Sequence, residues 1–280
     1  MMPVTGKINF NKLEESKSVI SKSYTMEDIV KLKEQFSLNG ERPKKLNVNS
    51  SYSLSIQYSL SGLSFYRHDT GYYMNFTINT VEEASNLISL LTDQESDLLY
   101  DHTNLIFCSD RYVAIPKDLY DSALDNDYLY AKNIICQENE KIITSSSCNI
   151  MYIYVIDNSI IKKIRATSPM VDIVHTLQFL VEYGQWRTTQ NGKTALYLSI
   201  HNNTLCYAIY ENKKLVAMDS IKNCDSNKME IIFSIINSKF NIEKTECLFD
   251  YEEKIASVSK KYIKKMDKIE SQNYFEQNYL

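Results

Sequence analysis

Two stretches of the chain share the tripeptide Leu-Ser-Ile and a similar pattern around it. SLSIQYSLSGLSFYR occupies residues 53–67, and YLSIHNNTLCYAIY occupies residues 197–210. In both, short runs in which apolar and polar residues alternate, as is typical of β-strands, are separated by Ser, Gly or Asn residues that favour turns. A shared tripeptide of common residues is weak evidence by itself. The elements that follow it must decide whether the chain uses one folding unit twice.

The first stretch predicts three consecutive strands, then a helix, then a fourth strand. The three strands are YSLSIQY, GLSFYRH and GYYMNFTI. Thr80 is the expected N-cap of the helix, because Glu83 stands three residues later as in a capping box. Apolar residues then recur at helical spacing, at Ala84, Leu87, Ile88 and Leu91. The run NLIFC supplies the fourth strand.

The second stretch predicts the same order of elements. ALYLSIH, TLCYAIYE and KLVAMDSI alternate as three strands. Either Asp225 or Ser226 can cap the helix that follows, and ECLF supplies the fourth strand. The apolar face of this helix consists of Met229, Ile232, Phe233 and Ile236. The order strand, strand, strand, helix, strand therefore occurs twice and predicts an internal duplication.

The segment between the two units predicts further strands and helices. RYVAIPKDLYD favours a short strand and a turn of helix, and strands are also expected at 133–136 and 150–156. IYVIDNSIIKKI favours a strand followed by a short helix. SPMVDIVHTLQFLVEYG favours a longer helix, with Ser168 as N-cap, Pro169 at its first position and Gly184 just past its end.

The chain divides into three predicted regions. Residues 1–45 form an N-terminal arm with one helix, TMEDIVKLKEQF; residues 46–190 form the first unit and residues 191–280 the second. An amphipathic helix is expected over YEEKIASVSKKYIKKMDKI, and ESQNYFEQNYL forms a last strand or a tail.

Charge and cysteine usage exclude several classes of partner. A formal net charge of -4 and a pI of about 5.7 give no electrostatic attraction for nucleic acid or for an anionic membrane. No apolar run suits a signal peptide or a membrane span, so we expect a cytoplasmic protein. The six cysteines show no metal-binding spacing, and we expect buried free thiols; they are Cys108, Cys136, Cys148, Cys206, Cys224 and Cys247.

Three antiparallel strands, a helix and a parallel strand, used twice, resemble the ribonuclease-H-like unit of actin, sugar kinases and heat-shock ATPases. From about residue 46 to 250 the chain is similar to an uncharacterised bacterial family related to the actin-like proteins of cell division and type IV pilus assembly. The stretches that carry this resemblance are LSIQYSLSGLSFYR, SDRYVAIPKDLYD, YLYAKNI, NIMYIYVID, VDIVHTLQFL and LYLSIHNNTLCYAIYENKKLVAMDSI. The resemblance implies an α/β (α+β) actin-like ATPase fold with two subdomains, and it implies no known reaction.

The resemblance also locates an interdomain cleft, where actin-like ATPases open each phosphate-binding hairpin with Asp-x-Gly. The carboxylate holds magnesium through water and the glycine lets backbone amides reach the phosphates. Here Gln57, Tyr58 and Ser59 occupy the first position, and His201, Asn202 and Asn203 the second. The sequence also has no glycine after Gly192 for an adenosine site. We therefore expect no ATP hydrolysis, no metal and no cofactor, and regard Gln57, Ser59, His201 and Asn203 as remnants of the cleft.

Other catalytic arrangements have simpler explanations. A two-metal nuclease needs a carboxylate on the first strand, where this chain has Gln57 or His201. His175 is expected to make a structural hydrogen bond to a nearby carbonyl, and His102 to lie in a cap or loop. Tyrosines on the strands could form an exposed binding surface, but half-buried sheet positions explain them better; they are Tyr66, Tyr72, Tyr207 and Tyr210.

The sequence thus predicts a non-enzymatic cytoplasmic scaffold or adaptor that acts through protein contacts. The alternative is an atypical nucleotide-binding or phosphotransfer protein that uses the same cleft with unfamiliar residues. A structural dimer that buries its hairpins is a third possibility. No nucleic acid or membrane insertion is expected, and the sequence identifies no particular protein partner.

Overall fold

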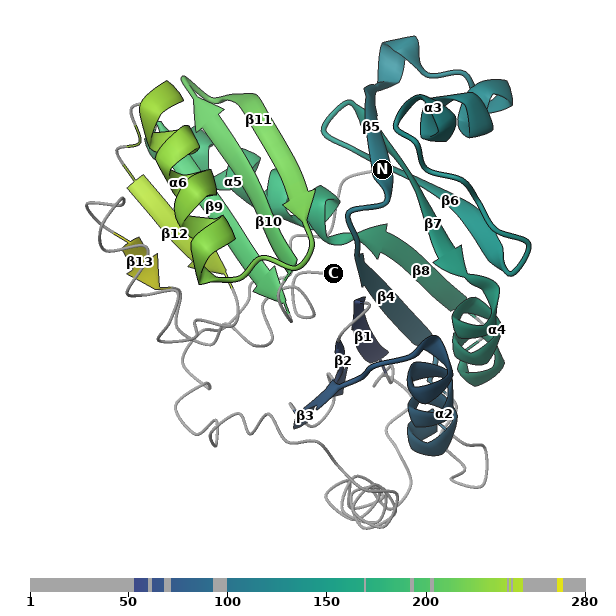
Figure 1. The fold of residues 1–280 in the computed structure, drawn as a ribbon. Coiled ribbons are helices and arrows are strands. Elements are labelled where there is room, and N and C mark those ends of the chain that lie inside the picture. Colours follow the sequence, from purple (N-terminus) through teal and green to yellow (C-terminus); the bar gives the residue numbers. More distant parts are fainter. Residues whose placement is uncertain are drawn as a thin grey trace, which may run out of the picture.

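The computed structural model describes residues 53–59, 62–67, 72–92, 100–168, 170–191, 194–201, 204–240, 242, 244–248 and 266–268. These residues form two five-stranded sheets and one three-stranded sheet, with helices packed against them (Figure 1). None of the helices within them combines the length and apolar character needed to span a membrane.

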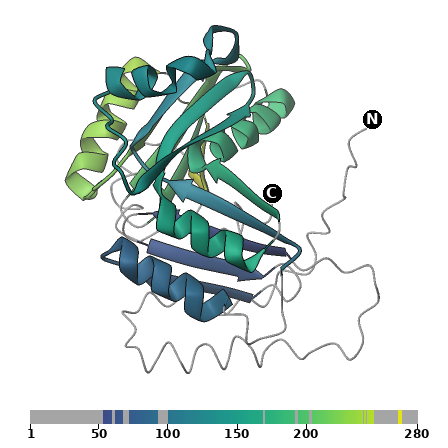
Figure 2. The same cartoon turned by 90° about the vertical axis from the view of Figure 1, so that its right-hand side faces the viewer.

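The first module is a mixed sheet of strand order β3-β2-β1-β4-β8. β1 to β3 are antiparallel, whereas β4 runs parallel to β1 and β8 parallel to β4. Helices α2 and α4 lie side by side over one face of this sheet (Figure 2). The bounds are β1 Ser53–Ser59, β2 Gly62–Arg67, β3 Tyr72–Thr77, α2 Val81–Thr92, β4 His102–Cys108, α4 Asn158–Thr167 and β8 Met170–His175.

The second module is a sheet of strand order β11-β10-β9-β12-β13, the same order as in the first. Its first three strands are antiparallel, and β12 pairs in parallel with both β9 and β13. The predicted order of three strands, a helix and a strand is therefore present in both modules. The bounds are β9 Ala195–His201, β10 Thr204–Glu211, β11 Lys214–Ile221, α6 Ser226–Lys239, β12 Lys244–Leu248 and β13 Met266–Lys268.

Local capping chemistry starts the two equivalent helices as the sequence predicts. The Thr80 hydroxyl accepts a hydrogen bond from the Glu83 amide at 3.1 Å, and the Glu83 carboxylate accepts one from the Asn79 amide at 2.7 Å. In α6 the Asp225 carboxylate accepts a bond from the Lys228 amide at 2.8 Å. Asp225, not Ser226, is therefore the N-cap.

An insertion, residues 112–157, separates β4 from β8 and forms the three-stranded sheet β5-β7-β6. The strand predicted at 133–136 is wrong. Helix α3 ends there, with Asn133 at a φ of 58° and the Ile134 amide bonded to the Leu129 carbonyl at 2.9 Å, which is a Schellman-type cap. The bounds are β5 Tyr112–Pro116, η2 Lys117–Leu119, η3 Ser122–Leu124, α3 Asp125–Ala131, β6 Glu140–Ser147 and β7 Ile150–Asp157.

The helix predicted over residues 168–184 is confirmed for residues 176–184, but its predicted start and end are wrong. Its first part is strand β8, paired with β4, and helix α5 Thr176–Asn191 begins only after it. The Ser168 hydroxyl donates to the Met170 carbonyl, and Ser168 is the C-cap of α4 and not the N-cap of α5. Pro169 lies outside the described residues. Gly184 lies within α5, where an added Cβ would come within 2.5 Å of the Tyr210 ring and 2.9 Å of the Tyr197 ring. Glycine is thus needed there for close packing and not as a helix stop.

The C-terminal helix predicted over residues 251–269 is wrong where the structure tests it, because Met266–Lys268 is strand β13. Residues 251–265 lie outside the described residues, as do the predicted N-terminal helix and the last strand or tail.

One hydrophobic core joins both modules. It runs from Leu54 and Phe65 in the first sheet, through Leu180 and Tyr183 of α5, to Tyr210 in the second sheet. Helix α5 also anchors the second sheet directly, because the Tyr210 hydroxyl donates to the Val181 carbonyl at 2.6 Å. A second core lies beneath α6 and a third lies within the insertion. The predicted boundary at residue 190 thus lies in the last turn of α5, a helix that packs on both modules. The division itself stays a prediction.

Candidate functional site at the junction of the two modules

Gln57 and Ser59 lie two residues apart in β1 and therefore share one face of the first sheet. Both side chains are buried, with Gln57 only 2% exposed. Gln57 is opposite Ser64 of β2, so the register aligns uncharged polar residues across these strands. The Ser59 hydroxyl donates to the Gly62 carbonyl at 3.4 Å. This end of β1 is consequently neutral, ordered and closed to solvent.

Tyr58 occupies the opposite face of β1 and belongs to the hydrophobic core. Its ring stacks on Phe107 at a centroid distance of 5.6 Å. Burial, with a smaller contribution from the Asp157 charge, raises the pKa of Tyr58 to about 12. Tyr58 therefore remains an uncharged packing residue at neutral pH.

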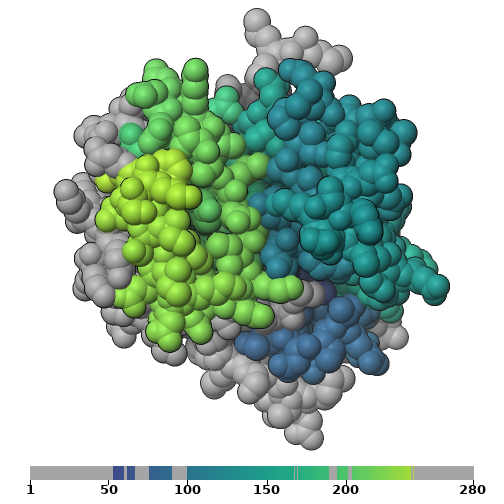
Figure 3. Space-filling view, turned by 45° about the horizontal axis from the view of Figure 1, so that its top comes forward, coloured from purple at the N-terminus to yellow at the C-terminus, as the bar shows by residue number. Residues whose placement is uncertain are grey.

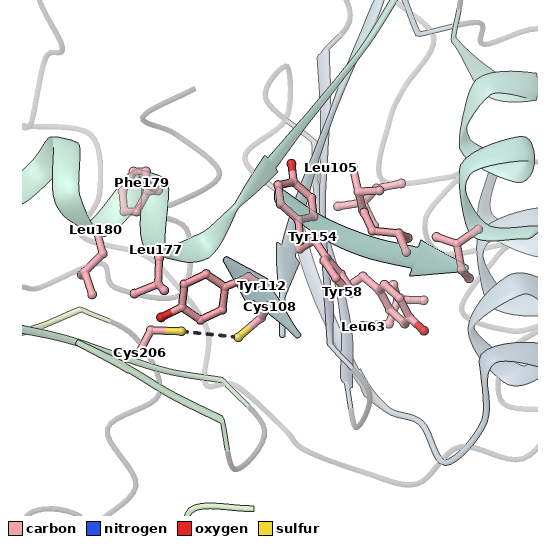
Figure 4. Close-up of a cluster of buried hydrophobic side chains, with 14 of the residues drawn as sticks. Tyr58, Leu63, Leu105, Cys108, Tyr112, Tyr154, Leu177, Phe179, Leu180 and Cys206 are labelled. Carbon is pink, nitrogen blue, oxygen red and sulfur yellow. Dashed lines mark hydrogen bonds between the residues drawn. The ribbon is translucent and has the colours of Figure 1, made fainter. Parts of the chain in front are cut away.

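The second module contacts the first module on β4, the strand next to Ser59. Ser59 is aligned with Cys108 of β4, and the Cys108 sulfur lies 3.8 Å from the Cys206 sulfur of β10 (Figure 4). The Cys206 thiol also lies 3.3 Å from the Ser220 hydroxyl and can donate to it. All four side chains are buried. Small, neutral groups therefore fill this contact between the sheets.

Two polar contacts between the insertion side and the second module flank the cysteines. The Tyr112 hydroxyl donates to the Asp219 carboxylate at 2.9 Å, and Lys222 pairs with Asp110 at 3.2 Å. Burial and the Asp219 charge raise the pKa of Tyr112 above its usual range. We call these six residues the junction: Cys108, Asp110, Tyr112, Cys206, Asp219 and Lys222. In the space-filling view the green second module and the blue to teal part of the chain meet directly along a seam (Figure 3).

His175 supports the junction from inside the first module. It is fully buried, its Nε2 lies 2.9 Å from the Ser109 carbonyl, and its Nδ1 accepts a bond from the Leu177 amide at 3.2 Å. Burial lowers the pKa of His175 to about 4, so the ring is neutral and Nε2 carries the proton. Its ring stacks on Tyr112 at 4.9 Å. The predicted structural hydrogen bond is confirmed, although His175 ends a strand and does not lie on a helix.

The structure places only part of the predicted set of cleft residues. Gln57 and Ser59 lie on one strand, as expected. His201 is the last residue of β9 and its backbone pairs with Thr204, but its side chain lies outside the described residues. Asn203 lies outside them altogether. The grouping of these four residues around a common cleft therefore stays a prediction.

The structure also tests the expectations for the strand tyrosines and for His102. Tyr66 and Tyr210 are buried and Tyr207 is half-buried, which favours the packing explanation over an exposed tyrosine surface at these three positions. The Tyr72 side chain lies outside the described residues. His102 begins β4 and its Nε2 lies 2.9 Å from Asp172, so its expected cap or loop position is wrong.

The expectation for the cysteines is confirmed in part. The five whose side chains the structure describes are free thiols, but Cys148 is exposed at the turn between β6 and β7, and Cys136 is only partly buried. Within the described ranges, no three His, Cys, Asp or Glu side chains are grouped as metal ligands.

The sequence reasoning missed the junction residues. Cys108 and Cys206 are 98 positions apart, and Tyr112 and Asp219 are 107 apart. Apolar strand positions signal that each cysteine is buried, but no local pattern signals which surfaces meet.

Two sheets of identical strand order, joined by a shared core and meeting at this junction, define a protein of the actin-like ATPase fold. A Bacteroides thetaiotaomicron crystal structure, described as a protein with actin-like ATPase fold and unknown function, is similar, with a TM-score of 0.65 and 19% identity over 81% of this chain and 94% of that one. A chain of the PilM–PilN type IV pilus biogenesis complex matches with a TM-score of 0.52 and 9% identity, over 80% of this chain and 89% of that one. At these identities the likeness concerns the fold alone.

The chain belongs to the family described as "Protein of unknown function (DUF3822)", whose model matches residues 42–249. This confirms the predicted resemblance to an uncharacterised family related to the actin-like ATPases. No curated protein matches the chain.

Proposed function

We propose that this protein is a non-catalytic adaptor that uses an actin-like fold to bind another protein. The observation that carries the proposal is the contact between Cys108 and Cys206, one strand from Ser59. Direct packing of small, neutral side chains occupies space beside the first hairpin, where a nucleotide-binding relative needs room for a charged ligand. Gln57 adds no negative charge to hold a magnesium ion, which prefers carboxylate and phosphate oxygens.

The side chain of Ser59, in the first hairpin, supports the same proposal. Ser59 is fully buried and its hydroxyl bonds to the Gly62 carbonyl. In the position where a phosphate-binding hairpin uses glycine to admit an anion, this side chain satisfies a backbone acceptor instead. We also infer that the two modules arose by duplication, since they share both strand order and helix position. Five free cysteines in the described part of the chain favour a reducing, cytoplasmic location.

The insertion offers the best surface for a protein partner. Four of the nine exposed large hydrophobic side chains in the described residues fall within it, at Leu119, Leu124, Tyr130 and Ile135. The surrounding sequence, residues 117–140, contains six acidic and two basic residues. Apolar side chains among acidic ones suit a partner segment with apolar anchors and a basic rim. We therefore assign this surface to the partner.

Nucleotide titration tests the non-catalytic part of the proposal. We expect the melting temperature of the full chain to be unchanged by Mg-ATP or Mg-ADP up to millimolar concentration, with a catalytic sugar kinase of related fold as positive control. A ligand present at 1,000 times its dissociation constant would stabilise the chain by about 4 kcal/mol, so a retained site would be visible. Saturable stabilisation by nucleotide would overturn the proposal in favour of an atypical nucleotide-binding protein.

A matched pair of substitutions tests the partner surface. Ile135 on the insertion and Ile231 on α6 are both 61% exposed, so Ile135→Ser and Ile231→Ser remove equal apolar exposure at distant places. We expect Ile135→Ser to abolish co-purification of a partner protein from native cells and Ile231→Ser to retain it. Equal recovery of the same partner with both variants would contradict the assignment of the insertion as the binding surface.

A further inference from the structure

Two thiols from different modules face each other in the interior of the protein. Cys108 ends β4 of the first sheet and Cys206 lies within β10 of the second (Figure 4). Their sulfurs are 3.8 Å apart, and both side chains are at most 1% exposed. A disulfide requires a separation of about 2.05 Å, so the sulfurs must approach by a little under 2 Å.

We propose that Cys108 and Cys206 are a redox modification site: mild oxidation joins them in a reversible disulfide that locks the two modules together. The inference concerns the junction alone and stands whether or not the adaptor role is correct. The substrate class of the modification is a small hydroperoxide such as hydrogen peroxide.

The chemistry balances with these three components. One thiolate attacks the peroxide, the O–O bond breaks and a sulfenic acid forms, while the departing hydroxide takes up the proton lost by the first thiol to give water. The second thiolate attacks that sulfenic sulfur, the S–S bond forms and the S–O bond breaks. Hydroxide leaves and takes up the proton lost by the second thiol. Two electrons pass from the two sulfurs to the peroxide, and two molecules of water result.

The surroundings of the pair explain why the thiols remain reduced at rest. The Ser220 hydroxyl lies 3.3 Å from the Cys206 sulfur, and this neutral group does not generate a thiolate. Both sulfurs are shielded from solvent, so peroxide reaches them only when the junction opens. The rate of disulfide formation therefore reports how often the modules separate.

The other cysteines provide built-in comparisons. Cys148 is exposed at a hairpin turn, and Cys224 is buried beneath α6 in a separate hydrophobic core. In the described part of the chain, Cys108 and Cys206 are the pair of sulfurs in contact across the two modules. Oxidation of Cys148 is expected to be fast and to cause no internal link, whereas Cys224 is expected to be protected.

The experiment treats the native full-length chain with hydrogen peroxide, blocks the remaining thiols with iodoacetamide in denaturant, and maps peptides by mass spectrometry. We expect a linked peptide pair containing Cys108 and Cys206, with the loss of two hydrogen atoms from the intact mass. Dithiothreitol should restore the reduced form. The oxidised chain should also melt at a higher temperature, because the bridge closes a long loop between the modules.

Substitutions at the cysteines and at the junction complete the test. Cys108→Ser and Cys206→Ser should each abolish the linked peptide, while Cys224→Ser should leave its yield unchanged. Tyr112→Phe, which removes the hydroxyl bonded to Asp219, should speed formation of the link by about tenfold or more by favouring junction opening. Oxidation of Cys108 or Cys206 to sulfinic acid without the linked peptide, in wild-type protein that remains folded, would overturn the proposal.

Discussion

His175 shows how a single buried side chain can make the stability of the whole protein depend on pH. The folded protein holds the ring neutral between the Ser109 carbonyl and the Leu177 amide, and burial lowers its pKa to about 4. In the unfolded chain the same ring takes its ordinary pKa of about 6.5. Between these values the unfolded state binds a proton that the folded state does not, so acid favours unfolding.

We predict that His175 contributes stability that is fully present above pH 6.5 and is lost as the pH falls towards 4. The loss approaches about 3 kcal/mol over this window. His175→Gln can keep a donor near the Ser109 carbonyl but does not titrate. The free energy of unfolding, measured with urea from pH 7 to pH 4, should therefore fall less steeply in the variant. Parallel pH profiles for the two proteins would exclude this role.

At the scale of single elements, the structure decides between two residues that the sequence alone leaves as equally good N-caps of α6. Asp225 and Ser226 can both cap a helix, and the structure gives the bond to the Lys228 amide to Asp225. Asp225→Ala should destabilise the protein by about 1 kcal/mol because it leaves that amide without its partner. Ser226→Ala is the neighbouring control and should change stability by much less. Urea denaturation of both variants measures the difference in the free energy of unfolding. A larger loss of stability in Ser226→Ala would contradict the assignment of Asp225 as the N-cap.

Helices and strands were predictable from sequence where local chemistry decides them. Examples are the helices that begin after Thr80 and Asp225 and the three strands that open each module. The start and the end of the helix predicted between Ser168 and Gly184 were not predictable, because the local signals at these two residues resemble a helix start and stop. Pairing of β8 with β4 and close packing of Gly184 on Tyr210 determine its structure, and both depend on residues far along the chain. The positions of Gln57 and Ser59 on the first strand were predictable from the hairpin pattern, whereas the cysteine contact on the neighbouring strand was not.

The whole molecule unfolds as one unit if the core and the junction couple its two modules. The core passes from the first sheet through α5 to the second, so α5 is packed against both modules. Polar contacts at the junction then fix how the modules sit against each other. Tyr112 and Asp219 form the contact best suited to measurement, because a largely buried hydroxyl donates to a carboxylate across the two modules.

We predict a coupling free energy of about 1.5–3 kcal/mol between Tyr112 and Asp219, the range for a hydrogen bond to a charged group. A double-mutant cycle with Tyr112→Phe and Asp219→Asn, followed by urea denaturation, measures it. The pair His102 and Asp172 is the control, because it joins two strands of one sheet and Asp172 is 73% exposed. Solvent screening should make its coupling much smaller.

Unfolding transitions followed by far-ultraviolet and near-ultraviolet circular dichroism should coincide in the wild type. Separate transitions, together with no coupling at Tyr112 and Asp219, would mean that the modules fold independently and that the junction does not hold them in one arrangement.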